Sequence, residues 1–178
     1  MKALLDACVL FPTATREVLL GLAAAGRFRP LWSERILEEW ARATPKLGEG
    51  AETVARGEIA ALRAAWPDAA ATVRPGTEAK LWLPDPNDVH VLAAAIDGGA
   101  DVLVTFNKRD FPRRELDGWG IRLIDPDALA MDAWLADGDA VERVVATVFR
   151  TAGLRGYDGD RRSLLKRAKM PRLGKALG

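Results

Sequence analysis

The sequence predicts an α/β fold with a mostly parallel central sheet, and three observations support this prediction. The first is an apolar segment at residues 2–11, which has the length and composition of a strand buried on both faces. The second is the alternation of further short apolar segments with segments of helical periodicity. The third is that polar side chains follow the strand-like segments, where parallel α/β sheets bind their ligands.

Each expected element has a local signal of its own. The strands are expected at residues 2–11, 27–33, 101–106 and 120–125, with a weaker candidate at 71–75. The helices are expected at residues 16–26, 34–44, 52–66, 89–99, 126–137 and 140–153. Suitable N-caps precede three of these helices: Thr13 or Thr15 for the first, Ser33 for the second, and Asn87 or Asp88 for the fourth.

The composition indicates a globular protein of one domain with a small appendage. Of the 178 residues, 49% are hydrophobic and 29% are charged. We expect a body at residues 1–130 and a basic helical extension at residues 131–178. Asp6 interrupts the first apolar segment, which argues against a signal peptide, and no segment is long enough to span a membrane. The single cysteine, Cys8, is expected to be buried and inert, and it suits a reducing cytoplasm.

The charge is distributed unevenly along the chain. Residues 150–178 hold nine Lys or Arg against two Asp, a formal charge of +7, which leaves −6 on residues 1–149 because the whole chain carries +1. An acidic body with a basic tail is a pattern associated with nucleic-acid contact. A helix that packs on the body through Leu164, Leu165 and Ala168 is an equally good interpretation.

Acidic and amide side chains gather where the fold would bring them together. Asp6 lies near the end of the first strand, Glu38 or Glu39 lies in the second helix, Asp88 opens the fourth helix, and Asn107 and Asp110 follow the strand "VLVT". Each position has a structural alternative: Asp6 can accept backbone N–H groups, Asp88 can cap its helix, and Asp110 can close a turn. Together they are expected to converge on one edge of the sheet.

Clustered carboxylates repel one another, so a hard cation is the natural partner. Mg²⁺ or Mn²⁺ suits phosphodiester hydrolysis, because it activates water and stabilises developing negative charge. Zinc does not fit, since the chain has one His and one Cys at no ligand spacing. His90, inside the fourth helix, is expected to be partly exposed and hydrogen-bonded.

Four segments resemble a known family in their residues and their order. They are "LLDACVLFP" with Asp6, "SERILEEW" with Glu39, "DPNDVHVLAAAIDGGADVLVTFNKRDF" with Asp88, and "GIRLIDP". Over about residues 1–130 the chain resembles the PIN-domain nucleases, in the VapC-like group of bacterial toxins. This resemblance implies a three-layer α/β/α fold and an endoribonuclease that uses Mg²⁺ or Mn²⁺. It also implies a cytoplasmic toxin that acts on RNA, forms a homodimer and is blocked by a cognate antitoxin protein.

The resemblance also assigns roles to single residues. Asp6, Glu39 and Asp88 would be the catalytic acids, with Glu39 chosen over Glu38 because it precedes the large apolar Trp40. The family's fourth acid aligns with Asn107, whose carbonyl can bind a cation but adds no charge. The expected metal ligands are therefore Asp6, Asp88, Asn107 and, as a reserve, Asp110. Thr105, Lys108 and Arg109 are expected to contact the substrate.

Three alternatives to a nuclease make specific demands on the same residues. A binding module on the same fold would follow if Asn107 marks lost activity. An aspartyl-phosphate hydrolase would need an acid two residues after Asp6, where Cys8 stands. A phospho-accepting receiver domain would need a central acid and a lysine at spacings that the chain does not contain.

Overall fold

A parallel sheet of four short strands forms the centre of the protein. The computed structural model describes all 178 residues. The strands are β1 (Lys2–Leu5), β2 (Arg29–Leu31), β3 (Val102–Val104) and β4 (Arg122–Ile124), in the spatial order β2-β1-β3-β4. All three strand pairs are parallel, and β1 pairs with β3 through Ala3–Val102, Leu4–Leu103 and Leu5–Val104. The predicted α/β class with a parallel sheet is confirmed.

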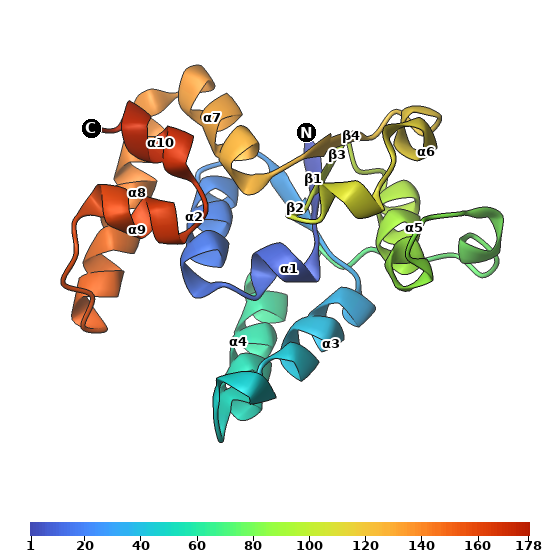
Figure 1. Ribbon diagram of the computed structural model, residues 1–178, viewed down its shortest axis with the longest axis horizontal. Helices are drawn as coiled ribbons and strands as arrows, with labels where there is room; N and C mark the ends of the chain where they lie inside the picture. The colour runs from blue at the N-terminus through green and yellow to red at the C-terminus, as the bar shows by residue number, and fades with distance from the viewer.

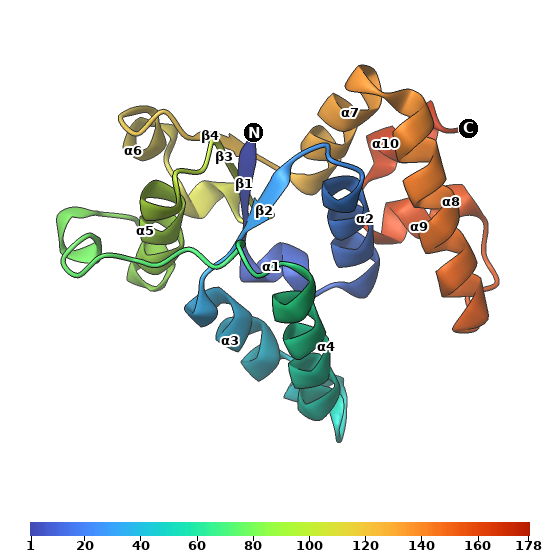
Figure 2. The same cartoon turned by 180° about the vertical axis from the view of Figure 1, so that it is seen from behind.

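Helices cover both faces of this sheet. The α-helices are α1 (Ala7–Leu10), α2 (Thr13–Ala24), α3 (Glu34–Ala43), α4 (Ala51–Ala65), α5 (Val89–Gly98), α6 (Arg113–Asp117), α7 (Pro126–Ala136), α8 (Gly138–Leu154), α9 (Arg161–Arg167) and α10 (Pro171–Ala176). Short 3₁₀ turns lie at Pro45–Leu47, Glu78–Lys80, Pro86–Asp88 and Lys108–Asp110. Figures 1 and 2 show α2 and α7 to α10 on one side of the sheet and α5 on the other, with α3 and α4 below it. This is the three-layer α/β/α arrangement that was expected.

The first predicted strand, at residues 2–11, is longer than the observed strand β1. The chain leaves the sheet after Leu5, and residues 7–10 form the short helix α1. Asp6 lies at this junction, with extended backbone angles and its N–H donated to Val104 O at 3.1 Å. An ionisable side chain is costly inside a two-sided strand, and at the strand end it can face the sheet edge instead. The structural change therefore occurs at the residue that the sequence marked as unusual.

Two other local predictions are wrong. Residues 71–75 form no strand, and only an isolated bridge joins Trp32 to Ala70. Neither threonine caps α2, because its N-cap is Pro12 and the hydroxyl of Thr15 donates to Ala168 O at 3.0 Å instead. The expected cap of α3 is confirmed, since Ser33 Oγ accepts from Ile36 N at 3.2 Å.

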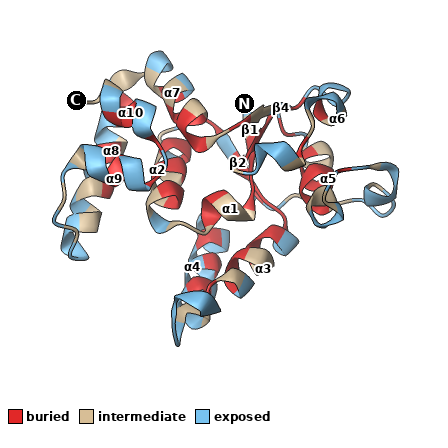
Figure 3. Cartoon of the chain, in the orientation of Figure 1, coloured by how far each residue is buried: buried red, intermediate tan, exposed pale blue.

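The C-terminal helices share a hydrophobic core with the sheet. One continuous cluster of 44 buried residues runs from Ala3 in β1 to Leu173 in α10, and Figure 3 shows buried ribbon in both parts. Asp127, at the start of α7, accepts hydrogen bonds from Arg172 N and Leu173 N at 3.0 and 3.1 Å. These bonds tie α10 to the end of the sheet. No helix is long and apolar enough to cross a membrane.

The basic segment at residues 161–177 is two helices rather than one. Lys169 has φ of +57° and is the one residue other than glycine with a positive φ. Pro171 then begins α10, and a proline is well tolerated at the first position of a helix. The turn at Lys169 sends α10 back toward α7, whereas a continuous helix would carry these residues away from the body.

Candidate active site

The carboxyl ends of β1 and β3 meet at the centre of the sheet. The chain proceeds from β1 to β2 on one side and later to β3 on the other, so the strand order reverses between β1 and β3. Ligands of open α/β sheets bind at such a reversal, outside the carboxyl ends of the strands. Asp6 follows β1 and Thr105 follows β3 at this place.

Asp6 is buried and held from one side. It is 5% exposed, and its Oδ2 accepts hydrogen bonds from Thr105 Oγ1 at 2.6 Å and from Cys8 Sγ at 3.1 Å. No hydrogen bond engages the other carboxylate oxygen, Oδ1. Thr105 itself is fully buried, and its Oγ1 also accepts from Asn107 N at 3.0 Å. Thr105 therefore orients Asp6 and the following loop.

Cys8 is part of this support. Burial, followed by the nearby carboxylate of Asp6, raises the pKa of its thiol to about 12. The thiol is therefore neutral, donates to Asp6, and accepts from Phe106 N at 3.3 Å. Cys8 is half-buried rather than buried as expected, but its neutral thiol agrees with the expectation of an unreactive cysteine.

The carboxylate of Asp88 is not used to cap its helix and is free to bind a ligand. Asp88 is the N-cap residue of α5, but its side chain makes no capping hydrogen bond. Asp85 does the local capping, since its Oδ1 accepts from Asn87 N at 2.9 Å. The alternative that Asp88 merely caps its helix is therefore wrong. Burial, and then repulsion from Asp6, Asp110 and Asp85, raises the pKa of Asp88 to about 6.

The two neighbouring glutamates of α3 point to different environments. Glu38 forms ion pairs with Arg42 at 2.7 Å and with Arg56 at 2.9 Å, away from the sheet edge. These arginines lower its pKa to about 2. Glu39 instead has a raised pKa of about 7, because of burial and the charges of Asp6 and Asp88, opposed by Arg35. Glu39 is thus the glutamate that faces the other acids.

His90 differs from the expectation. It is 2% exposed, and neither ring nitrogen makes an aligned hydrogen bond. Its Nε2 lies 2.7 Å from Glu39 Oε1, a close contact that is too bent for a conventional N–H bond. Burial, and then Arg35, lowers the pKa of His90 to about 4, so the ring is neutral near pH 7. The prediction of a partly exposed, hydrogen-bonded histidine is wrong, because α5 is buried around this position.

The loop after β3 carries the remaining predicted residues. Asn107 and Arg109 are exposed, and neither side chain has a hydrogen bond or an ion pair. Asp110 lies in the turn Lys108–Asp110 and is near enough to Asp88 to raise its pKa. Lys108 is turned to Asp125, with 2.7 Å between Nζ and Oδ2.

These donors suit a hydrated Mg²⁺ or Mn²⁺ ion better than a closed cage. Asp6, Glu39 and Asp88 share one electrostatic environment, yet no three His, Cys, Asp or Glu side chains converge closely enough to surround an ion. Mg²⁺ keeps several waters and needs only one or two protein carboxylates. Asp6, with a free Oδ1, and Asp88, with no capping bond, are the carboxylates that fit this requirement.

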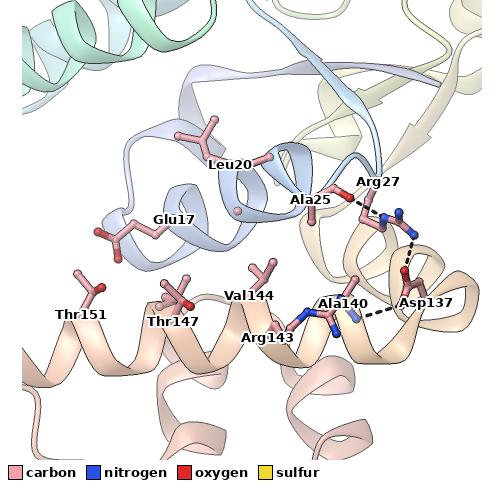
Figure 4. A pocket seen from close by; sticks show the side chains of 13 residues that line it. Glu17, Leu20, Ala25, Arg27, Asp137, Ala140, Arg143, Val144, Thr147 and Thr151 are labelled. Carbon is pink, nitrogen blue, oxygen red and sulfur yellow. Dashed lines mark hydrogen bonds and ion pairs between the residues drawn. The ribbon is translucent and has the colours of Figure 1, made fainter.

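The largest cavity lies elsewhere. A groove of about 710 Å³ runs between α2 and α8, and Figure 4 shows its lining side chains, including Glu17, Arg27 and Asp137. Arg27 Nη1 and Asp137 Oδ2 form an ion pair of 3.0 Å at one end. None of the acids at the carboxyl ends of β1 and β3 lines this groove. The candidate active site is therefore defined by its acidic side chains and not by the volume of a cavity.

Two contacts near the acids were not expected from the sequence. His90 contacts Glu39 across two helices, and Asp125 binds Lys108 at the carboxyl end of β4. Asp125 follows the strand-like segment "GIRLI" in the same way as Asp6 follows β1, and this pattern was a usable signal. The contact of His90 depends on how α3 and α5 pack, which no local pattern reports.

A three-layer α/β/α fold with acids at its strand-order reversal can hold a divalent metal ion that assists hydrolysis. A family model described as a PIN domain matches residues 2–109, and the chain belongs to the PIN-domain family. PIN domains are generally nucleases that use divalent metal ions, so membership supports a nuclease-type function. Comparison with curated proteins and with solved structures gives no match.

Proposed function

We propose that the protein is a metal-dependent endoribonuclease that acts as the toxin of a type II toxin–antitoxin system, resembling the VapC-like group. One observation carries the nuclease part of this proposal: Asp6, Glu39 and Asp88, from three distant segments, share one environment at the reversal of the strand order. The toxin role, the cognate antitoxin and a homodimeric state rest on the resemblance described above.

The residues have distinct roles in this proposal. Asp6 and Asp88 would hold Mg²⁺ or Mn²⁺, and Asn107 and Asp110 would supply further oxygen donors. The ion, when bound, activates a water and stabilises the charge that develops on the phosphate. Thr105 orients Asp6 through the 2.6 Å hydrogen bond. Glu39, whose pKa is raised by burial in the metal-free protein, would accept a proton from that water.

Cleavage of RNA by the purified protein tests the nuclease. With Mn²⁺ or Mg²⁺ we expect cleavage that a chelator abolishes and that Asp6→Asn or Asp88→Asn lowers by about 100-fold or more. The matched control is Asp117→Asn, which removes an exposed carboxylate from α6. Cleavage that survives both site variants would contradict the assignment of the acids.

A catalytically weak or inactive PIN module that binds RNA or a partner protein is the second candidate. The observation that favours it is Asn107, which supplies an amide where the family has a fourth acid. This candidate predicts that a folded, metal-loaded wild-type protein cleaves none of several RNAs, whereas Asn107→Asp gains cleavage. Activity of the wild type would exclude it.

A further inference from the structure

The C-terminal helices bring a second set of charged residues to the edge of the sheet that carries the acids. A pocket of about 420 Å³ is lined by Phe106, Lys108, Asp125, Asp127, Lys169 and Arg172, together with Pro171, and we name it the extension pocket. Phe106 and Lys108 follow β3, and Asp125 follows β4. Its volume lies in the range of ligand sites, and Phe106 directly follows Thr105, which bonds Asp6.

Lys169 is held at this pocket by the turn between α9 and α10. It is exposed, with φ of +57°, while Ala168 and Met170 on either side are fully buried. Thr15 donates to Ala168 O at 3.0 Å, and Met170 N donates to Leu165 O at 2.8 Å. A left-handed backbone is unfavourable for lysine, so the packing on both sides determines where this side chain lies.

The ammonium of Lys169 remains without an anionic partner. Its Nζ lies 4.3 Å from the ring centroid of Phe106, and Lys169 takes part in no ion pair. The contact with the ring places the charge at the residue next to Thr105. A cation over an aromatic face still offers its other N–H groups to an acceptor in solution.

The two acids of the pocket position the other two cations. Asp125 holds Lys108 at 2.7 Å, and Asp127 holds Arg172 Nε at 3.1 Å. Arg172 Nη2 also lies 3.6 Å from Asp125. Lys108, Lys169 and Arg172 together exceed Asp125 and Asp127 by one positive charge. One phosphodiester group, with a single negative charge, would balance the pocket.

We propose that the extension pocket binds a backbone phosphate of the RNA strand beside the nucleotide that is cleaved, with Lys169 as its principal cation. This inference rests on the proposed function, and it assigns substrate binding to the part of the chain outside the matched PIN domain. The pocket lies at the carboxyl ends of β3 and β4, close to the acids of the proposed nuclease site, so under the proposed function its expected ligand is an RNA phosphate rather than an acidic protein segment.

The decisive comparison is Lys169→Met against Lys175→Met. Both variants remove one exposed positive charge from the extension, but Lys175, in α10, does not line the pocket. Binding of a labelled single-stranded RNA of mixed sequence is measured with chelator present and at several salt concentrations. Unfolding temperatures of both variants verify that they fold.

We expect Lys169→Met to weaken RNA binding several-fold and to reduce the slope of log K against log salt concentration by about 0.7, which is one phosphate contact on a single strand. Lys175→Met should match the wild type. In cleavage assays with Mn²⁺, Lys169→Met should raise KM and leave kcat unchanged. Equal RNA binding by the two variants would overturn the inference.

The outcomes also separate this inference from the nuclease. If the wild type cleaves RNA and the two lysine variants bind RNA equally, the nuclease function is supported and RNA binding by the extension pocket is contradicted. If RNA binding depends on Lys169 but no RNA is cleaved, RNA binding by the extension pocket is supported and the proposed nuclease activity is contradicted. If Lys169→Met loses binding of polyglutamate and keeps that of RNA, the pocket belongs to an acidic protein segment and the inference is wrong.

Discussion

At the residue scale, one buried hydroxyl determines how Asp6 is presented. Thr105 Oγ1 donates to Asp6 Oδ2 and accepts from Asn107 N, so it couples the ends of β1 and β3. Replacing a residue that positions a metal ligand typically costs about 10- to 100-fold in metal affinity or activity. Thr105 is therefore a positioning residue in the proposed mechanism.

Replacing this hydroxyl by a methyl group tests that role. Thr105→Val keeps the side-chain shape and should lower kcat and the affinity for Mn²⁺ by about 10- to 100-fold, because Asp6 loses the stronger of its two side-chain donors and keeps only the thiol of Cys8. Thr105→Ser should restore most of both. Metal titration by calorimetry reports the affinity independently of cleavage. An unchanged affinity for Mn²⁺ in Thr105→Val would contradict the role.

The raised pKa values of Glu39 and Asp88 make the metal-free protein sensitive to pH. The folded state holds protons on these acids up to about pH 7 and 6, whereas their usual pKa values are 4.5 and 3.8. Between these limits the folded state binds more protons than the unfolded state, so their contribution to stability falls as pH rises and becomes constant only once Glu39 is fully ionised, roughly one pH unit or more above its pKa.

Chemical unfolding in the presence of chelator measures this effect. We expect Asp88→Asn to lose less stability than the wild type between about pH 4 and about pH 8. Mg²⁺ should restore stability of the wild type at the higher pH, because it binds the ionised acids. Equal pH dependence in the two proteins would show that the pKa of Asp88 is not raised in the folded state.

At the scale of elements, α2 and α8 approach each other at a glycine. A Cβ atom on Gly21 would lie 2.6 Å from Cγ1 of Val144 in α8. Val144 is β-branched and restricted to few rotamers in a helix, so it cannot move away easily. Gly21 lies within α2 and has ordinary helical backbone angles, so its conformational freedom is not needed. Glycine is required here because any side chain would collide with Val144 of α8.

Alanine at this position should therefore loosen the packing of α8. We expect Gly21→Ala to destabilise the protein by about 1–3 kcal/mol, as overpacking does. Gly57→Ala is the matched control, because Gly57 lies inside α4 with no atom near its Cβ position. That variant should gain about 0.5–1 kcal/mol from helix propensity. Thermal unfolding of both variants measures the difference, and a stabilised Gly21→Ala would contradict the close contact.

At the scale of the whole molecule, the body and the basic extension are joined by one core. The cluster of buried residues includes Leu4 of β1, Leu19 of α2, Val145 of α8 and Leu165 of α9. The division at residue 130 that we expect from the sequence thus falls inside a continuous apolar interior. A shared core favours cooperative unfolding of both parts.

Unfolding by guanidinium chloride should accordingly show a single transition. Tryptophan fluorescence reports mainly the body, because five of the six tryptophans lie in residues 1–130, including the buried Trp32 and Trp40. Far-UV circular dichroism reports all helices, including α8 to α10. We expect their midpoints to coincide. An earlier transition in circular dichroism alone would mean that the extension unfolds independently, as a separate domain would.

The sequence by itself determined the α/β class, the four strands β1 to β4 and the Ser33 cap of α3, and it predicted that acids including Glu39 gather at one edge of the sheet. These follow from periodicity, capping and the parallel-sheet rule, which are local or topological. Tertiary structure decided that His90 is buried, that Lys169 reaches Phe106, and that Glu38 forms an ion pair with Arg56. Burial, charge environment and long-range contacts arise only when segments far apart in the chain pack together, so no window of the sequence contains them.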